Sequence, residues 1–350
     1  MYLDWAIQKL TARLDLTREE AGRVTEDLFS GNVPDEEIVA FLVALRNKGE
    51  KADELVGFAR VMRARAAETL RQSGVDLEEM ARAGALLDTC GTGGDGAGTF
   101  NVSTAAALVA AGAGVRVAKH GNRSISSRCG SADILEELGV AIDFPLAHIP
   151  ACLERTGMVF LFAPHLHLAT KHVMSARRSL KGKTVFNFLG PLTNPLGATI
   201  QLVGVFDRAR TEMLAQACAA VGTHRGFVVA AHDGFDEIST TGPTQVSEVD
   251  AGSVRTRNIY PEDFGLPRAT TMALQGGDAK ANAEILRRML DGERSPYRDV
   301  VLANASAALV AANKADNFVG GVEVAAESLD SGAARRTLAT LVEFTQRSKS

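Results

Sequence analysis

The sequence has few of the features that mark several large classes of protein. It contains only four cysteines in 350 residues, Cys90, Cys129, Cys152 and Cys218, and no two of them form a CxxC pair. This spacing argues against a structural zinc site and against a disulfide framework. No apolar run reaches the ~18 residues that a membrane span requires, and the first residues lack the layout of a signal peptide. We therefore expect a cytoplasmic protein without a membrane partner.

An excess of basic charge is also absent. The formal net charge is -4, from 38 Lys and Arg against 42 Asp and Glu. A general nucleic-acid-binding protein would be basic overall or carry a basic face, so we expect no nucleic-acid partner. Hydrophobic residues make up 46% and charged residues 23% of the chain, which are ordinary values for a globular enzyme. The length suffices for one large core or two smaller ones.

Glycine, by contrast, is concentrated in one place. Residues 91–98 hold five glycines, between an apolar run at 85–87 and an Ala-rich run at 105–113. This layout predicts a strand, a tight loop and a helix that begins near Asn101. Backbone N–H groups of such a loop can converge on an anion, and the helix N-terminus adds more of them. A phosphate site is favoured over the alternative that the glycines only turn the chain.

The glycine spacing alone does not identify the phosphate ligand. Gly91-x-Gly93-x-x-Gly96 matches the dinucleotide-binding fingerprint, which also expects an acidic residue at the end of the next strand. Here the next predicted strand is followed by Lys119, and a cation suits a second phosphate better than a ribose. A Walker loop is excluded, because no Lys-Ser or Lys-Thr pair follows the glycines.

Residues 1–82 show only helical patterns. Thr17-Arg-Glu-Glu20 fits a capping box, and apolar residues within 38–45 fall at i, i+3, i+4 and i+7. We expect a helical domain over 1–82 with about four amphipathic helices, joined by helices from about 165–185. Its apolar faces would serve either a subunit contact or packing on the rest of the chain.

Over residues 83–350 predicted strands alternate with helices. This alternation indicates an α/β domain with a mostly parallel central sheet flanked by helices, whose ligand loops lie at the carboxyl ends of its strands. We expect three of these loops to converge: the glycine loop, 119–123 and 232–238. The pairs Gly190-Pro191 and Asn194-Pro195 predict turns that end the segment 184–189.

Two adjacent carboxylates, Asp236 and Glu237, follow a predicted strand end. A solvated acidic turn is the ordinary explanation of an isolated Asp-Glu pair. Facing a phosphate, however, the pair needs a cation, and Mg²⁺ prefers oxygen ligands and bridges carboxylate to phosphate. Convergence with two phosphate-type loops favours the Mg²⁺ site. Asp95, Ser103 and Thr104 are further candidates around the metal or the phosphate.

Several polar residues are candidates for substrate contact. Lys119 is a natural point charge for a phosphate, and His120 and Asn122 follow it in the same predicted loop. Arg177 could hold a carboxylate in bidentate fashion, although a solvent-facing arginine on a basic helix is nearly as plausible on sequence alone.

Six groups of residues together resemble the anthranilate phosphoribosyltransferases of tryptophan biosynthesis. They occur in the family's order over nearly the whole chain, and their combination is highly specific. They are Gly91–Asp95, Asn101–Thr104, Lys119–Arg123, Ser126-Ser127 with Gly130–Asp133, Phe188–Pro195, and Asp236-Glu237.

The resemblance implies a small helical-bundle domain and a larger α/β domain of the nucleoside phosphorylase and phosphoribosyltransferase type, a homodimer formed through the helical domain, and phosphoribosyl pyrophosphate (PRPP) with Mg²⁺ as co-substrate. The implied reaction transfers the 5-phosphoribosyl group to the amine of anthranilate. The residues implied for PRPP are Gly91, Thr92, Gly93, Gly94, Asp95, Asn101, Ser103, Thr104, Lys119 and Ser131. Those implied for anthranilate are Gly91, His120, Asn122, Arg177 and Gly190, and those for Mg²⁺ are Ser103, Asp236 and Glu237.

One stretch departs from the family pattern: His167-Leu-Ala-Thr170 stands where a run like His-Pro-Ala-Met is usual, beside the expected acceptor channel. No general base is assigned, because the amine of anthranilate becomes acidic once it has attacked. Two alternatives stay open. One is a pyrimidine nucleoside phosphorylase, which also binds phosphate beside a ribose, and the other is a non-catalytic nucleic-acid-binding relative, which the net negative charge disfavours.

Overall fold

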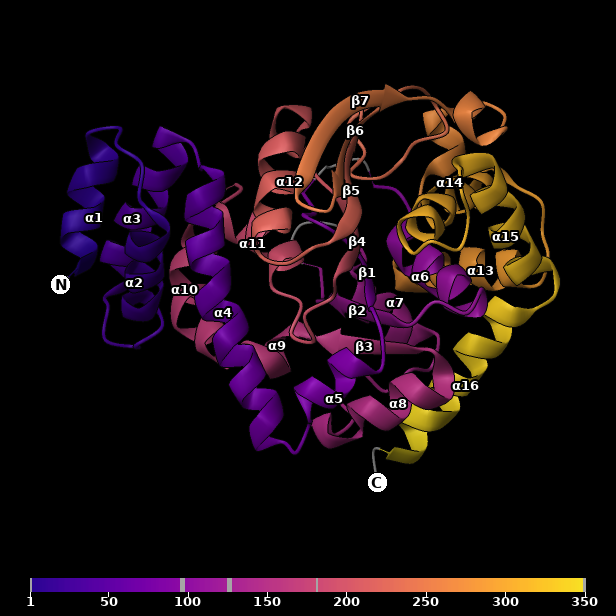
Figure 1. The fold of residues 1–350 in the computed structure, drawn as a ribbon, viewed down its shortest axis with the longest axis horizontal. Coiled ribbons are helices and arrows are strands. Elements are labelled where there is room, and N and C mark those ends of the chain that lie inside the picture. The colour runs from indigo at the N-terminus through magenta and orange to yellow at the C-terminus, as the bar shows by residue number, and fades with distance from the viewer. Residues whose placement is uncertain (1, 95–97, 125–127, 181, 349–350) are drawn as a thin grey trace.

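The computed structural model describes residues 2–94, 98–124, 128–180 and 182–348. Figure 1 shows a bundle of helices from the N-terminal part of the chain beside a larger part in which helices surround a sheet. Among the described residues, no helix combines the length and the apolar composition needed to cross a membrane.

The described residues of the N-terminal part form five helices, where about four were expected. The capping box at the start of the second helix is present, because the Thr17 hydroxyl accepts from Glu20 N at 3.2 Å and Glu20 Oε2 accepts from Thr17 N at 2.8 Å. The apolar residues of the third helix are buried, as their spacing predicts. The helices are α1 (Tyr2–Thr11), α2 (Arg18–Leu28), α3 (Asp35–Lys48), α4 (Ala52–Gln72) and α5 (Leu77–Arg82).

Within the described residues the sheet has seven strands in the order β3-β2-β1-β4-β5-β6-β7. The first five pair in parallel, which confirms the predicted mostly parallel sheet, while β6 and β7 form an antiparallel hairpin that was not predicted. The strands are β1 (Leu87–Gly91), β2 (Val117–Gly121), β3 (Met158–Phe162), β4 (Ile200–Gly204), β5 (Arg225–Ala231), β6 (Thr244–Asp250) and β7 (Ser253–Ile259).

The strand order creates a switch point between β1 and β4. From β1 the chain adds β2 and β3 on one side and then returns to add β4 and β5 on the other. Open α/β sheets bind ligands at the carboxyl ends of their strands at such a point. The glycine loop leaves β1 at this place.

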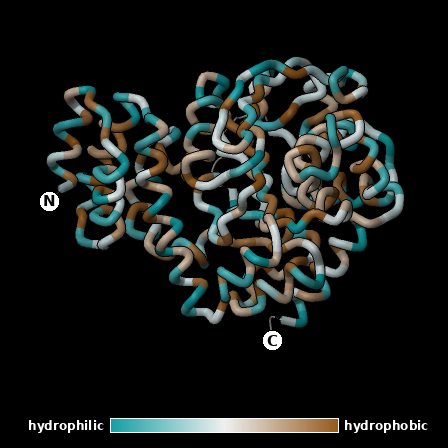
Figure 2. The backbone as a smooth tube through the Cα atoms, viewed as in Figure 1, coloured by the Kyte–Doolittle hydropathy of each residue, from teal (hydrophilic) through white to brown (hydrophobic). Residues whose placement is uncertain are grey.

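Two hydrophobic clusters flank the sheet. One packs α6, α14 and α16 against the sheet, and the other runs from α12 and α11 into the helical bundle. In Figure 2, hydrophobic and hydrophilic positions alternate along the outer helices, as expected for helices with one buried face. The remaining helices are α6 (Val102–Gly112), α7 (Ser131–Glu137), α8 (Ile149–Thr156), α9 (Ala163–Leu166), α10 (Lys171–Ser179), α11 (Val185–Leu192), α12 (Thr211–Ala220), α13 (Ala279–Leu290), α14 (Pro296–Ala311), α15 (Phe318–Asp330) and α16 (Ala333–Ser348).

Two local expectations were wrong. Gly190-Pro191 does not end a segment, because α11 continues through Pro191 to Leu192. Pro191 is next to the last residue of α11, so the loss of its N–H and the steric effect of its ring are confined to the end of the helix. Lys119 and His120 lie within β2 and not in the loop after it.

Arg63 of α4 joins the helical part to the sheet part. Its Nε donates to the Leu192 carbonyl and its Nη1 to the Val221 carbonyl, both at 2.6 Å. Burial lowers the pKa of Arg63 from its usual value. The guanidinium therefore bonds the carboxyl ends of α11 and α12 to the bundle.

Candidate active site

The loop after β1 lies directly against the loop after β5. Gly93 N donates to Asp236 Oδ2 at 2.9 Å, and Thr92 N donates to the Gly204 carbonyl at 2.9 Å. A Cβ at Gly91 would lie 2.7 Å from Asp236 Oδ2, and one at Gly204 would overlap the backbone of Asp236. This close approach requires glycine at position 204, and it leaves room for a Cβ at position 91 only if the Asp236 side chain moves. Two of the three loops that were expected to converge are thus in contact.

The third segment reaches the same place through Lys119. Its side chain is only 1% exposed, and its ammonium donates to the Thr89 carbonyl and, at 3.4 Å, to Ser103 Oγ. Burial lowers the pKa of Lys119, while the carboxylate of Asp88 acts in the opposite direction. The positive charge therefore lies between β1 and the first turn of α6, where it supports the glycine loop from within the protein.

Asp88 is a buried carboxylate that the sequence analysis did not single out. Its Oδ1 accepts from His120 N at 3.1 Å and its Oδ2 from Asn194 Nδ2 at 2.9 Å. The same Asn194 amide donates to the Ala118 carbonyl at 2.8 Å. Burial raises the pKa of Asp88 to about 6. These bonds tie β1, β2 and the turn after α11 together directly below the ligand loops.

His120 faces α11 and a second histidine. Its Nδ1 lies 3.2 Å from the Gly190 carbonyl, and its ring centroid is 5.1 Å from that of His167. Both rings are buried, and the Nε2 atoms of both have no hydrogen-bond partner among the described residues. Burial lowers the pKa of His120 to about 3 and that of His167 to about 4. Both imidazoles are therefore neutral near pH 7.

Arg177 lies on α10, half-buried, with its guanidinium 5.5 Å from the centre of the Phe186 ring. Burial lowers its pKa from the usual value. Phe186 and Gly190 both belong to α11. Arg177 from α10 and His120 from β2 therefore approach the same helix from different elements. The Arg177 side chain is therefore partly covered, and its role in binding a carboxylate stays a prediction.

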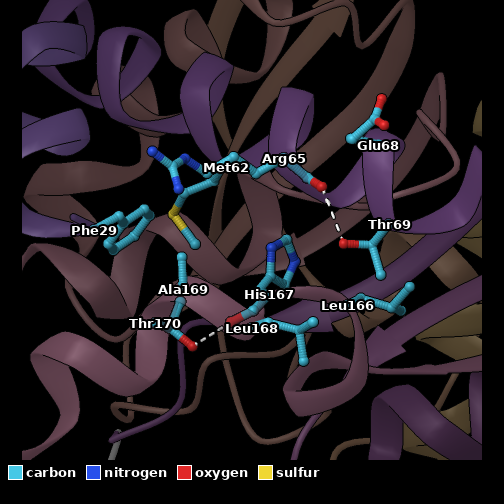
Figure 3. A pocket seen from close by; sticks show the side chains of 10 residues that line it. All are labelled: Phe29, Met62, Arg65, Glu68, Thr69, Leu166, His167, Leu168, Ala169 and Thr170. Carbon is cyan, nitrogen blue, oxygen red and sulfur yellow. Dashed lines mark hydrogen bonds between the residues drawn. The ribbon is translucent and has the colours of Figure 1, made fainter. Parts of the chain in front are cut away.

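A cavity of about 240 Å³ lies between the helical bundle and the segment 166–170. In Figure 3 the side chains of Met62 and His167 project between α4 and this segment. The stretch His167–Thr170, which departs from the family pattern, therefore forms one wall. Because His167 also contacts His120, the cavity adjoins the site. Its lining comprises Phe29, Met62, Arg65, Glu68, Thr69 and Leu166–Thr170.

The remaining predicted residues gather around the first turns of α6 and α7. Asn101 Nδ2 donates to the Cys129 carbonyl at 3.2 Å, and Ser131 Oγ donates to the Asn122 carbonyl at 3.4 Å. Ser103 is half-buried, whereas Thr104 is fully buried within α6. Gly94 lies in the glycine loop. Asp95, Ser126 and Ser127 lie outside the described residues.

Two further residues, Lys183 and Asn304, also support the ligand loops. Lys183 has its Nζ 3.4 Å from the centre of the Phe206 ring, and a Cβ at Gly94 would lie 3.1 Å from Lys183 Cε. Asn304 of α14 donates from Nδ2 to the Ile238 carbonyl at 2.8 Å and accepts from Ile238 N at 3.0 Å. The basic run before α11 could have indicated Lys183. No local pattern indicated Asn304.

Asp236 and Glu237 suit a metal that is shared with a ligand. Within the described parts of the chain, no three His, Cys, Asp or Glu side chains are grouped so as to hold a metal by themselves. Mg²⁺ is typically bound by one or two carboxylates together with water and substrate phosphates. The Asp236 carboxylate is already oriented by Gly93 N. The oxygen donors present therefore fit an ion that also binds a diphosphate.

Comparison with known proteins gives the class. Residues 6–66 match the helical bundle domain of the glycosyl transferase family, and residues 83–335 match its a/b domain. Together with a site at the switch point of the sheet, these matches define a two-domain glycosyl transferase.

Relatives narrow this class to one family. The anthranilate phosphoribosyltransferase of Pelotomaculum thermopropionicum is 50% identical over 97% of this chain and 96% of its own, and that of Moorella thermoacetica is 48% identical over 97% of each. The Thermus thermophilus enzyme structure has a TM-score of 0.87 at 40% identity, covering 97% of this chain and 99% of that one. The chain belongs to the anthranilate phosphoribosyltransferase family, which confirms the resemblance and the fold class expected from the sequence.

Proposed function

We propose that this protein transfers the 5-phosphoribosyl group of PRPP to the amine of anthranilate, giving N-(5-phosphoribosyl)anthranilate and pyrophosphate. In tryptophan biosynthesis this is the second step from chorismate. The contact between the glycine loop and Asp236, with Lys119 beside the same loop, carries the proposal. A structure of the Saccharomyces cerevisiae enzyme in complex with PRPP and Mg has a TM-score of 0.86 at 29% identity, covering 99% of this chain and 98% of that one.

The donor site that we propose lies between the glycine loop, α6 and α7. Asn101 stands at the N-terminus of α6 and makes no side-chain cap bond to the described residues there, so the first N–H groups of the helix can meet a phosphate. Lys119 adds positive charge at the same turn. The proposed PRPP contacts are Gly91, Thr92, Gly93, Gly94, Asp95, Asn101, Ser103, Thr104, Lys119 and Ser131.

Asp236, Glu237 and Ser103 would hold Mg²⁺. When bound, the ion neutralises charge that develops on the pyrophosphate as it leaves. Gly93 N keeps the Asp236 carboxylate turned toward the glycine loop, and Asn304 fixes the backbone just after Glu237. These contacts place the acidic pair before any ligand arrives.

The proposed mechanism follows from the charges. Cleavage of the bond between ribose C1 and pyrophosphate leaves a cationic sugar and an anionic leaving group. The N–H groups of the loop and the Lys119 ammonium stabilise the growing negative charge. The aromatic amine is uncharged and weakly nucleophilic, so the site must hold it against C1 and exclude water.

The proposed acceptor site uses Gly91, His120, Asn122, Arg177 and Gly190. Arg177 would bind the carboxylate of anthranilate, and the neutral His120 ring would line the site next to Gly190. Because the pKa of His120 is only about 3, it is a poor proton acceptor, which agrees with a mechanism that requires no strong general base.

We also propose a homodimer formed through the helical bundle, and a cytoplasmic location. Trp5 of α1 is 39% exposed and Leu14 after it is 57% exposed, and a second copy would cover such side chains. The four cysteines are buried and form no disulfide within the described chain, which suits a reducing compartment. Light scattering of the purified protein at several concentrations would show a monomer if the dimer proposal is wrong.

The loss of anthranilate fluorescence tests the proposed reaction. It should occur only when PRPP and Mg²⁺ are both present, with a product of the expected mass. Lys119→Ala should weaken PRPP use, and the double variant Asp236→Ala with Glu237→Ala should lose Mg²⁺ dependence and most activity. Unchanged turnover in both variants would overturn the assignment. Phosphorolysis of thymidine, assayed in parallel, would point instead to the nucleoside phosphorylase alternative.

A further inference from the structure

A buried asparagine on the C-terminal side of the molecule bonds to the donor site. Asn282 lies on α13 and is 1% exposed. Its Nδ2 donates to Asn101 Oδ1 at 3.0 Å, across 181 residues of sequence, and its Oδ1 accepts from Gly277 N at 2.7 Å. Asn101 Nδ2 in turn donates to the Cys129 carbonyl at 3.2 Å. The chain of bonds thus runs from Gly277 through two amides to the residues just before α7.

The two ends of this series of hydrogen bonds fix the orientation of both amides. Gly277 N can only donate, so it must face Asn282 Oδ1, and the Cys129 carbonyl can only accept, so it must face Asn101 Nδ2. The amide oxygen and nitrogen of each side chain are therefore assigned by the network itself. Asn101 is half-buried, so part of its side chain stays accessible while its amide is held in one orientation.

A second set of contacts joins the same part of the chain to the exit of the glycine loop. Gly276 N donates to the Gly98 carbonyl at 2.8 Å, and Thr99 and Gln275 form an isolated antiparallel bridge. A Cβ at Gly276 would lie 2.6 Å from Phe100 N, so the two segments pack without space for a side chain. Residues 275–277 therefore lie against residues 98–100, and Asn282 holds them there through Gly277.

We propose that Asn282 is a positioning residue for the diphosphate donor: it orients Asn101 and sets the spacing between the N-terminus of α6 and that of α7. The proposal rests on the proposed function, in which Asn101 at the start of α6 and Ser131 at the start of α7 contact PRPP. Asn282 itself touches no substrate. Asn282 keeps the donor site assembled before PRPP binds, which lowers the free energy needed to order the site on binding.

Replacement of Asn282 by aspartate tests this role with a nearly isosteric side chain. The carboxylate of the Asn282→Asp variant still accepts from Gly277 N, but it presents an acceptor to Asn101 Oδ1, so the Asn101 amide turns or shifts. We expect the KM for PRPP to rise roughly tenfold, the scale of one unmatched buried polar contact, while kcat and the KM for anthranilate change less than about twofold. Asn282→Ser, whose shorter uncharged side chain cannot bridge Gly277 N and Asn101 Oδ1, should raise the same KM to a smaller extent.

Two controls separate positioning from general damage. Asn317→Asp makes the same chemical change at an exposed N-cap of α15, where aspartate is an equally good cap, and should leave all constants unchanged. Thermal unfolding of each variant reports its folding. In an Asn101→Ala background, Asn282→Asp should add less than about a twofold effect on the KM for PRPP, because the amide that it orients is gone.

The possible results are distinct. An inactive wild-type protein would refute the proposed function and, with it, the positioning role that rests on it. An active wild type with a folded Asn282→Asp variant of unchanged KM for PRPP would overturn the positioning role, as would equal increases in both substrates' KM values. Independent, multiplicative effects of the Asn101 and Asn282 changes would overturn it as well. If Asn282→Asp does not fold, the Asn282→Ser variant decides by the same criteria.

Discussion

Gly91→Ala should disturb the metal ligand without disturbing the fold. Gly91 does not have a positive φ, so alanine can adopt its backbone conformation. The added Cβ, however, would lie 2.7 Å from Asp236 Oδ2 and 3.4 Å from its Cγ, closer to the oxygen than nonbonded atoms approach. The end of a side chain yields more easily than backbone, so we expect the carboxylate to rotate away and break its bond from Gly93 N.

The size of the effect follows from that bond. A hydrogen bond to a charged group contributes about 1.5–3 kcal/mol. Since every ~1.4 kcal/mol is a factor of ten, the loss corresponds to a roughly 10- to 150-fold rise in the Mg²⁺ concentration needed for half-maximal activity. The free energy of unfolding should change by less than about 1 kcal/mol, because the displaced group is already at the edge of the core.

The assay is a Mg²⁺ titration of the rate of anthranilate fluorescence loss at saturating PRPP. Gly242→Ala is the matched control, because a Cβ at Gly242 would meet no described atom within 4 Å and its φ is not positive. A Gly91→Ala variant with the Mg²⁺ dependence of the wild type would refute the placement of Asp236 against the glycine loop.

Three further predictions concern support of the site and its protonation. Arg63→Met should lower the free energy of unfolding by about 2–4 kcal/mol in urea, because the carbonyls of Leu192 and Val221, both partly buried, lose their donor. Asn304→Asp should raise the Mg²⁺ requirement more than the KM for anthranilate, because it loosens the backbone after the acidic pair. Below about pH 6.5 the unfolded chain protonates His120 and His167 while the folded protein keeps them neutral, so stability should fall as pH falls from about 6.5 toward 4. Asp88, whose pKa is about 6 in the folded protein, takes up a proton in the folded state and so offsets the effect of one histidine. The free energy of unfolding should therefore fall by about 1.4 kcal/mol per pH unit.

Each of these predictions has a control or a refuting result. Arg60→Met removes an exposed arginine one turn earlier on α4 and should be silent, so equal destabilisation by both variants would refute the role of Arg63. Equal effects of Asn304→Asp on Mg²⁺ and on anthranilate would refute its local action. His167→Gln should flatten the pH dependence of unfolding measured at about pH 5, 6 and 7. An unchanged slope would contradict the neutral buried state of His167.

Local patterns predicted the parts of the fold that depend on neighbouring residues. The capping box at Thr17, the buried face of α3 and the strand before the glycine loop all follow from the spacing of residues a few positions apart. The alternation of strands and helices predicted a mostly parallel sheet, whereas the switch point depends on the strand order, which no sequence pattern indicated. The hairpin β6–β7 was missed because most of β7 is exposed and polar, so it shows no apolar alternation.

The supporting contacts of the site could not be predicted in the same way. Asp88 and Asn194 are 106 residues apart, and Asn101 and Asn282 are 181 residues apart. Such bonds are defined by how the sheet and α13 pack, and no spacing in the sequence encodes them. Lys119 illustrates the same limit, since its identity indicated a charge for the ligand, but its burial beside Thr89 and Ser103 emerged only from the fold.

Calorimetric titration of PRPP tests most directly whether the glycine loop and the acidic pair bind one ligand together. The wild-type protein should bind PRPP at least roughly tenfold more tightly with Mg²⁺ than without it, while the double variant Asp236→Ala with Glu237→Ala should bind PRPP equally weakly in both conditions. A double variant that keeps the full Mg²⁺ enhancement would show that the acidic pair and the glycine loop do not share one ligand.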